Sequence, residues 1–255
     1  MLRSRIIPCL LVHKGGLIKT VQFNKPKYVG DPLNAVRIFN EKEVDELIVI
    51  DVDATVHAKE PNYKLIYELS KECRMPLCYG GGIKKIEHVE KIISLGVEKV
   101  AISSAAITNK ELISESVLRV GSQSVVIVLD VKKTGILKKR YEVFTHNGKR
   151  NTHTCPIQLA VEMQGKGVGE ILINSIDQDG TMAGYDIELI DKIRNAVSIP
   201  ITALGGAGSY NDFAGLINNF GVLGVAAGSL FVFKGKYRAV LINYPNNDQK
   251  NEIIF

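Results

Sequence analysis

The two halves of the sequence resemble each other, and this repeat limits the folds that the chain can adopt. The segment MPLCYGGGIKKIE resembles IPITALGGAGSYND, and the aligned glycines Gly80 and Gly205 are 125 residues apart. VAISSAAI and VAAGSLFV show the same offset, while ELIVIDVDAT at Glu46 and EILINSIDQDGT at Glu170 are 124 residues apart. An offset of about half of the 255 residues predicts a fold built from two similar units.

Short apolar runs alternate with amphipathic segments along the whole chain. The apolar runs are predicted to be strands covered on both faces, at residues 5–11, 46–51, 76–79, 99–103, 125–129, 170–174, 200–203 and 223–227. The amphipathic segments are predicted helices, at residues 31–44, 62–73, 85–96, 109–121, 155–167, 186–197 and 210–221. This pattern predicts the α/β class and a TIM (β/α)8 barrel built from two half-barrel repeats. A doubly wound open sheet is the alternative. Because no linker-like segment separates the halves, residues 1–255 are expected to form one domain.

Composition and charge exclude several classes of protein. The net charge of +5 is spread in short runs such as Lys132–Lys133, so we expect no nucleic-acid binding. No apolar run approaches the roughly 18 residues of a membrane span, and we expect a cytoplasmic protein that binds no membrane. The four cysteines lack the spacing of zinc ligands, which predicts free thiols and no metal. His146 and His153 are expected to be exposed polar residues.

Glycine and serine follow four of the predicted strands at corresponding places in the two halves. In a TIM barrel the loops after the strands form the active site, and glycines let backbone N–H groups approach an anion. Two equivalent pairs of loops would suit a substrate with a phosphate at each end, although each loop alone could be simple turn chemistry. The candidate phosphate-binding residues in these loops are Gly81, Gly82, Ser103, Ser104, Gly205, Gly206, Gly228 and Ser229.

Carboxylates also follow the strands, where they could act as general acids or bases. The candidates are Asp51, Asp53, Asp130, Asp177 and Asp179. Asp130 is the preferred catalytic residue, with Asp51 as a further candidate. Asp179 could cap or orient the loop at Gly180, and both are assigned to phosphate binding. When the first strand is aligned with the fifth, Leu11 falls on Asp130, so only one half carries a carboxylate there.

Several motifs together resemble one enzyme family. RIIPCL, DELIVID, GGGI, GSQSVVIVLD, GEILINSIDQDGT, GYD, GGAG and AAGSLF are similar to the cyclase subunit of imidazole glycerol phosphate synthase, the HisF family, from Met1 to about Lys234. The resemblance implies a barrel paired with a HisH-type glutaminase subunit. Ammonia from the glutaminase would pass through the barrel to a bisphosphorylated substrate on the other face. No metal or organic cofactor is implied.

The resemblance also assigns roles to individual residues. It implies an ammonia gate at the N-terminal face of the barrel, a glutaminase contact at Glu98, and catalytic roles for Lys19 and Asp130. The gate residues are Arg5, Glu46, Lys99 and Glu170. Without the resemblance, such a charged ring could simply stabilise the bottom of the barrel.

Other positions depart from the family. The catalytic aspartate of the family's CLDV motif is Leu11 here, and a positioned acid or base typically contributes 10² to 10⁴-fold to a rate. Further departures at the same face are Asp53 for threonine, Ser103 for asparagine, Asn174 for threonine and Leu204 for serine.

These departures leave three interpretations. The sequence retains the residues of the ammonia gate but lacks one catalytic aspartate. This combination favours a paralogue that passes ammonia to a separate sugar amidotransferase in surface-polysaccharide biosynthesis, of the lipopolysaccharide or O-antigen type. The alternative is a working histidine-pathway cyclase, which makes imidazole glycerol phosphate and AICAR from PRFAR and ammonia. A non-catalytic scaffold fits least, because it would not need Lys19, Asp130 and the gate together.

Overall fold

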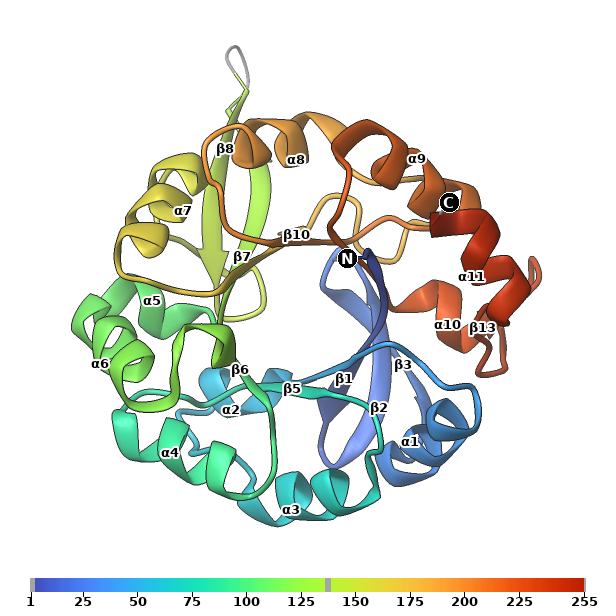
Figure 1. Cartoon of the computed structure of the whole chain (residues 1–255), viewed down its shortest axis with the longest axis horizontal. Helices are drawn as coiled ribbons and strands as arrows, with labels where there is room; N and C mark the ends of the chain where they lie inside the picture. Colours follow the sequence, from blue (N-terminus) through green and yellow to red (C-terminus); the bar gives the residue numbers. More distant parts are fainter. Residues whose placement is uncertain (1–2, 136–138, 255) are drawn as a thin grey trace.

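Eight parallel strands form a closed barrel in the computed structural model, which describes residues 3–135 and 139–254. Each barrel strand pairs with the next, β7 pairs with β10, and β12 pairs with β1, so the barrel closes (Figure 1). The prediction of a TIM barrel is confirmed. The barrel strands are β1 (Arg5–His13), β4 (Leu47–Asp51), β5 (Leu77–Gly80), β6 (Lys99–Ile102), β7 (Val125–Thr134), β10 (Glu170–Ser175), β11 (Ile201–Leu204) and β12 (Gly224–Ala227).

Helices surround the barrel as an outer ring (Figure 1). Polar caps explain where several of them begin: Asp31 accepts the Asn34 N–H at 2.9 Å before α1, and Asn109 and Asp186 cap α6 and α8 in the same way. The long helices are α1 (Pro32–Glu41), α3 (Tyr63–Glu72), α4 (Ile86–Ser94), α6 (Lys110–Val120), α7 (Pro156–Gly165), α8 (Ile187–Arg194), α9 (Tyr210–Phe220) and α11 (Asn247–Ile254). Shorter ones are α2 (Val52–Val56), α5 (Ser104–Thr108), α10 (Ser229–Val232) and the 3-10 turn η1 (Ser122–Ser124).

Two apolar clusters result from this arrangement. The larger one lies between the strands and the helices, where Phe39, Phe213 and Phe231 are fully buried. The smaller one fills the inside of the barrel and consists of Ile7, Cys9, Ile48, Cys78, Ala101, Val126, Leu172 and Ala226. Across residues 3–135 and 139–254, no helix has the length and hydropathy needed to cross a membrane.

Additional strands extend the barrel beyond the predicted elements. After β1 the chain forms the hairpin β2 (Gly16–Val21) and β3 (Asn24–Gly30), and after β7 it forms β8 (Arg140–Thr145) and β9 (Arg150–Asn151). A small hairpin, β13 (Phe233–Lys234) and β14 (Ala239–Val240), follows α10. The first strand continues to His13 rather than ending at residue 11, because β2 pairs with its final residues.

The register of the strands relates the two halves. Leu11 on β1 pairs with Ile50 on β4, and Asp130 on β7 pairs with Asn174 on β10. Ile50 and Asn174 are 124 residues apart, the same offset as Glu46 and Glu170. Leu11 therefore occupies in the first half-barrel the position that Asp130 occupies in the second.

Candidate active site

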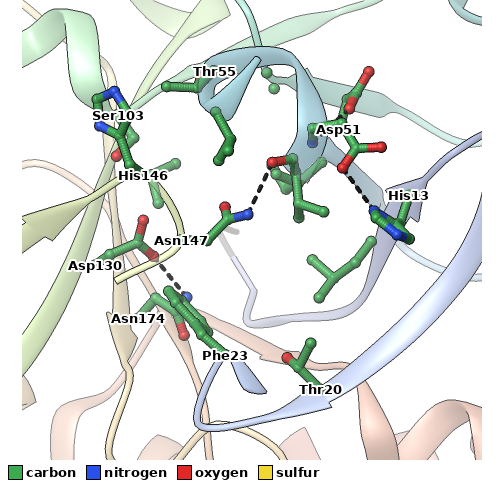
Figure 2. Close-up of a pocket in the computed structure, with 18 of the residues that line it drawn as sticks. His13, Thr20, Phe23, Asp51, Thr55, Ser103, Asp130, His146, Asn147 and Asn174 are labelled. Atoms are coloured by element: carbon green, nitrogen blue, oxygen red, sulfur yellow. Dashed lines mark hydrogen bonds and ion pairs between the residues drawn. The ribbon is translucent and has the colours of Figure 1, made fainter. Parts of the chain in front are cut away.

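A cavity of about 470 Å³ opens at the C-terminal ends of the barrel strands. Many of the residues predicted from the sequence line it: Lys19, Asp51, Gly81, Gly82, Ser103, Ser104, Asp130, Asp179 and Gly228. Gly180, Gly205, Gly206 and Ser229 are not among the lining residues. Figure 2 shows Asp130 and Asn174 on one side of this cavity and His13 and Asp51 on the other.

Asp130 lies in the middle of β7, partly buried, and lines the cavity. Its Oδ1 accepts a hydrogen bond of 2.8 Å from the Asn174 amide. Burial raises the pKa of Asp130 to about 6, against the opposing effect of hydrogen bonds from Asn174 and Ser103. A carboxyl group that titrates near neutrality can both hold and release a proton, as general acid–base chemistry requires.

Lys19 projects from β2, and only 6% of its surface is exposed. Its ammonium donates to the backbone carbonyl of Cys9, and burial lowers its pKa. A Cβ at Gly228 would overlap the Lys19 ammonium, so the glycine after β12 makes room for this side chain. The resemblance to HisF places Lys19 in a loop, whereas the structure places it on a paired strand.

His13 and Asp53 form a pair at the mouth of the barrel that the sequence did not predict. The Asp53 carboxylate lies 2.7 Å from the His13 Nδ1 and accepts the Lys14 N–H at 2.7 Å. Burial would raise the pKa of Asp53, but the Lys14 N–H and the His13 ring outweigh it and lower the pKa. Side chains alternate along a strand, so His13 faces the same side of β1 as Leu11. This spacing was the one sequence signal that could have placed His13 at the site.

Asp51 acts as a helix cap in this structure. Its Oδ1 accepts the N–H groups of Asp53 at 2.9 Å and Ala54 at 3.2 Å, at the start of α2. Burial raises the pKa of Asp51 in spite of these two bonds. The side chain lines the cavity, so the capping role leaves it within reach of a ligand.

The glycine-rich loops have a steric explanation within the protein. Gly81 has φ +119°, and a Cβ there would overlap the Asp51 carbonyl oxygen. Gly206 has φ +111°, and a Cβ there would overlap the Gly184 carbonyl oxygen. Both positions therefore exclude other residues whether or not a phosphate binds.

Asp179 connects the loop after β10 to the first hairpin. It accepts the Thr20 hydroxyl at 2.8 Å and the Phe23 N–H at 3.3 Å, and burial raises its pKa. Gly180 packs directly on the backbone of Thr20 in β2. His146, on the turn after β8, also lines the cavity, while His153 is largely exposed.

The opposite, N-terminal end of the barrel holds a closed ring of alternating charge. Arg5 contacts both glutamates, Glu46 directly and Glu170 at 2.8 Å; Lys99 contacts Glu46 at 2.9 Å and Glu170 at 3.0 Å. Burial alone would raise the pKa of Glu170, but the two cations outweigh it and lower the pKa. The structure thus brings together all four residues predicted for the gate.

Glu98 is exposed beside this ring, next to Lys99 at the start of β6. Its carboxylate accepts the Leu77 N–H at 2.7 Å. Among the described residues, no group of three or more His, Cys, Asp or Glu side chains is arranged to hold a metal ion.

A closed (β/α)8 barrel with titratable side chains around one mouth defines a TIM-barrel enzyme. The family model described as histidine biosynthesis protein matches residues 5–238. The chain belongs to this family and is of the HisF type within it.

Three relatives illustrate this membership, each provisionally named as a subunit of imidazole glycerol phosphate synthase. The HisF subunit of Leptospira interrogans is 54% identical over 100% of both chains. The hisF3 subunit of Vibrio vulnificus is 51% identical, covering 100% of this chain and 97% of its own. The hisF2 subunit of Pseudomonas aeruginosa is 54% identical, covering 96% of this chain and 97% of its own.

Proposed function

We propose that this HisF-type subunit receives ammonia from a HisH-type glutaminase and has lost most of its ring-closing activity. The glutaminase would dock at the N-terminal end of the barrel, near Glu98. Ammonia would pass the charged ring and the interior of the barrel to the cavity at the other end. It would then serve amidation of a sugar by a separate amidotransferase in surface-glycan biosynthesis.

The proposal depends mainly on one difference between the two half-barrels, at equivalent positions on β1 and β7. The second half presents Asp130, whereas the first half presents Leu11 at the corresponding position. A leucine transfers no proton, so a reaction that needs a carboxylate on both sides of its substrate loses one of them. The numbers in the relatives' names hisF2 and hisF3 also fit a paralogue.

The two ends of the barrel support the ammonia route. The ring is net neutral, since Arg5 and Lys99 balance Glu46 and Glu170, and its members hold one another by direct ion pairs. The interior between the ring and the cavity is filled by apolar side chains. A route between these side chains would favour neutral ammonia over the ammonium ion, because burying an unpaired charge is costly.

An ammonia-dependent cyclase assay tests the proposal with PRFAR and ammonium chloride. The purified chain should turn over far more slowly than Leu11→Asp, by about 10² to 10⁴-fold if the carboxylate is restored in place. Leu11→Asn is the matched control, because it adds a polar group of similar size that cannot act as an acid. Rapid turnover by the unaltered chain would refute the loss of ring closure.

A working cyclase is the second candidate, and the His13–Asp53 pair favours it. Asp53 binds the Nδ1 side of the His13 ring, which leaves Nε2 available at the cavity as a proton acceptor or donor. In this interpretation His13 would replace the carboxylate that is missing at Leu11. Turnover by the unaltered chain that is lost in His13→Gln and in Asp53→Asn, with the fold intact, would establish this alternative.

A further inference from the structure

A buried histidine contacts one of the glycine loops of the cavity from behind. His88, on α4, is 3% exposed, and its Nδ1 lies 3.1 Å from the Gly82 carbonyl oxygen. Gly82 lines the cavity, whereas His88 is not among the lining residues. The imidazole therefore touches the wall of the cavity on the side away from a ligand.

The other nitrogen of the imidazole faces an exposed carboxylate. His88 Nε2 has no hydrogen-bond partner among the described residues, but it lies 3.4 Å from the Glu60 Oε1. The Glu60 side chain is 62% exposed and also contacts the Lys85 ammonium at 3.5 Å. The Tyr63 ring meets the imidazole edge-on. Carbonyl and carboxylate oxygens only accept hydrogen bonds, so an imidazole that satisfies both neighbours carries a proton on each nitrogen.

The segment that carries Glu60 also packs on the glycine loop. Gly82 has φ +74°, and a Cβ there would lie 2.9 Å from the Lys59 carbonyl oxygen and 3.0 Å from the Glu60 carbonyl carbon. His88 thus contacts two segments of the same wall, the loop after β5 and the segment between α2 and α3. Because Gly82 has no side chain to anchor it, contacts from neighbouring residues fix the position of its backbone.

The half-barrel repeat shows that packing alone does not require a histidine here. Phe213 on α9 lies 125 residues after His88, the same offset as the glycine loops, and it is fully buried. An apolar side chain therefore fills the equivalent position in the second half-barrel. In that half the Gly184 N–H donates to the Gly206 carbonyl at 2.9 Å, so a backbone hydrogen bond connects the glycine loop to its neighbour. The first half uses the His88 side chain.

We propose that His88 is a positioning residue of the cavity. Its Nδ1–H holds the Gly82 carbonyl and its Nε2 side engages Glu60, so that the glycine loop keeps the position in which it binds a ligand. His88 itself touches no ligand and acts through the backbone of Gly82. The inference concerns the wall of the cavity and does not depend on the ammonia route or on the glutaminase.

Two substitutions of His88 separate hydrogen bonding from packing. His88→Phe fills the space, as Phe213 does in the other half, but donates nothing to Gly82. His88→Asn leaves part of the space empty but keeps an N–H donor that reaches about as far as Nδ1. Calorimetry with PRFAR measures ligand affinity, and urea denaturation measures stability. Binding needs neither turnover nor a partner subunit, so failure of the proposed function leaves this result intact.

The two measurements should rank the variants in opposite order. His88→Phe should unfold at the higher urea concentration, whereas His88→Asn should bind PRFAR more tightly. Relative to the parent, His88→Phe should lose about two- to tenfold in affinity, the loss of one hydrogen bond. Affinity that follows stability would indicate a merely structural role and overturn the proposal. Unchanged affinity in His88→Phe, or no binding of PRFAR by the parent, would also overturn it.

The imidazole supplies a spectroscopic check. In protein labelled with nitrogen-15 at histidine, the His88 signals are those that are missing from His88→Phe. The neutral imidazole should carry its proton on Nδ1, because the exposed Glu60 side chain can turn away while the Gly82 carbonyl is fixed in the backbone. A neutral imidazole protonated on Nε2, the form that free histidine prefers, would contradict the bond to Gly82.

Glu60→Gln tests the second contact, with Lys85→Gln as the matched control. Neither side chain lines the cavity. Glu60→Gln should weaken PRFAR binding about two- to fivefold in the parent and cause no further loss in His88→Phe. Lys85→Gln leaves the carboxylate beside His88 and should not change the affinity. Additive losses from Glu60→Gln and His88→Phe would show that Glu60 does not act through His88.

Discussion

Replacing Asp130 with asparagine should make the protein more stable at neutral and alkaline pH. The pKa of Asp130 is raised from 3.8 to about 6, chiefly by burial. Since one pKa unit corresponds to 1.36 kcal/mol, ionising this carboxyl in the folded protein costs about 3 kcal/mol more than in the unfolded chain. Asp130 therefore binds its proton more tightly in the folded protein than in the unfolded chain. Relative to the ionised form, the protonated carboxyl stabilises the folded protein fully below about pH 4, and this effect is lost as the pH rises through about 6.

The asparagine introduced by Asp130→Asn would keep the acceptor oxygen for Asn174 and would carry no charge at any pH. We therefore compare the free energy of unfolding of Asp130→Asn with that of the parent at each pH. Between about pH 4 and about pH 8, the variant should gain about 3 kcal/mol relative to the parent. Urea denaturation followed by circular dichroism at a series of pH values measures this difference.

Asp53→Asn is the control with the opposite sign. The pKa of Asp53 is lowered, so the Asp53 carboxylate stabilises the folded protein above the pKa of the unfolded chain and loses that effect in acid. The Asp53→Asn variant should therefore become less stable relative to the parent protein as the pH rises. A stability difference for Asp130→Asn that does not change with pH would refute the assignment of a buried, proton-holding carboxyl.

Three further predictions concern other parts of the barrel. Glu170→Gln should destabilise the protein by about 3–5 kcal/mol in urea denaturation, because it leaves Arg5 and Lys99 with one buried carboxylate between them. An unchanged midpoint would mean that the ring contributes nothing to stability. Gly206→Ala should lower the melting temperature, since the residue has φ +111° and no room for a Cβ, and an unaltered melting temperature would contradict that geometry. Glu98→Lys should weaken binding of the glutaminase in calorimetry without changing the fold, and equal affinity would count against this docking face.

The barrel was predictable from the sequence because its signals are local and repeated. Each barrel strand is a short apolar run, and the offset of 124 to 125 residues relates the two halves. The two hairpins after β1 and β7 were missed because their strands are partly exposed and mixed in composition. KPKY in β3 shows the difficulty: it contains a proline and two lysines, and within residues 3–135 and 139–254 β3 pairs only with β2.

The site was predictable in part, for a related reason. Residues that follow strands, such as Asp130, could be placed at the mouth from topology alone. His13 and Asp53 are 40 residues apart and lie on different elements, so their contact depends on the neighbouring strands β1 and β4 and on the hairpin that lengthens β1. The hydrogen bond from Asn174 to Asp130 depends on the orientation of one amide group, which no sequence pattern specifies.

The two ends of the barrel use the half-barrel repeat in different ways. At the N-terminal end, Glu46 and Glu170 are equivalent residues from the two halves, and both contribute to one ring. At the C-terminal end, the equivalent residues Leu11 and Asp130 differ, so only one of the two half-barrels presents a carboxyl group at this position. Ring closure in the proposed function requires groups on both sides of a substrate. The chain meets this requirement only if His13 supplies what Leu11 lacks, which makes His13→Gln in the Leu11→Asp background informative. If His13 substitutes for the carboxylate, this double variant should retain the activity of Leu11→Asp, whereas His13→Gln alone should have none.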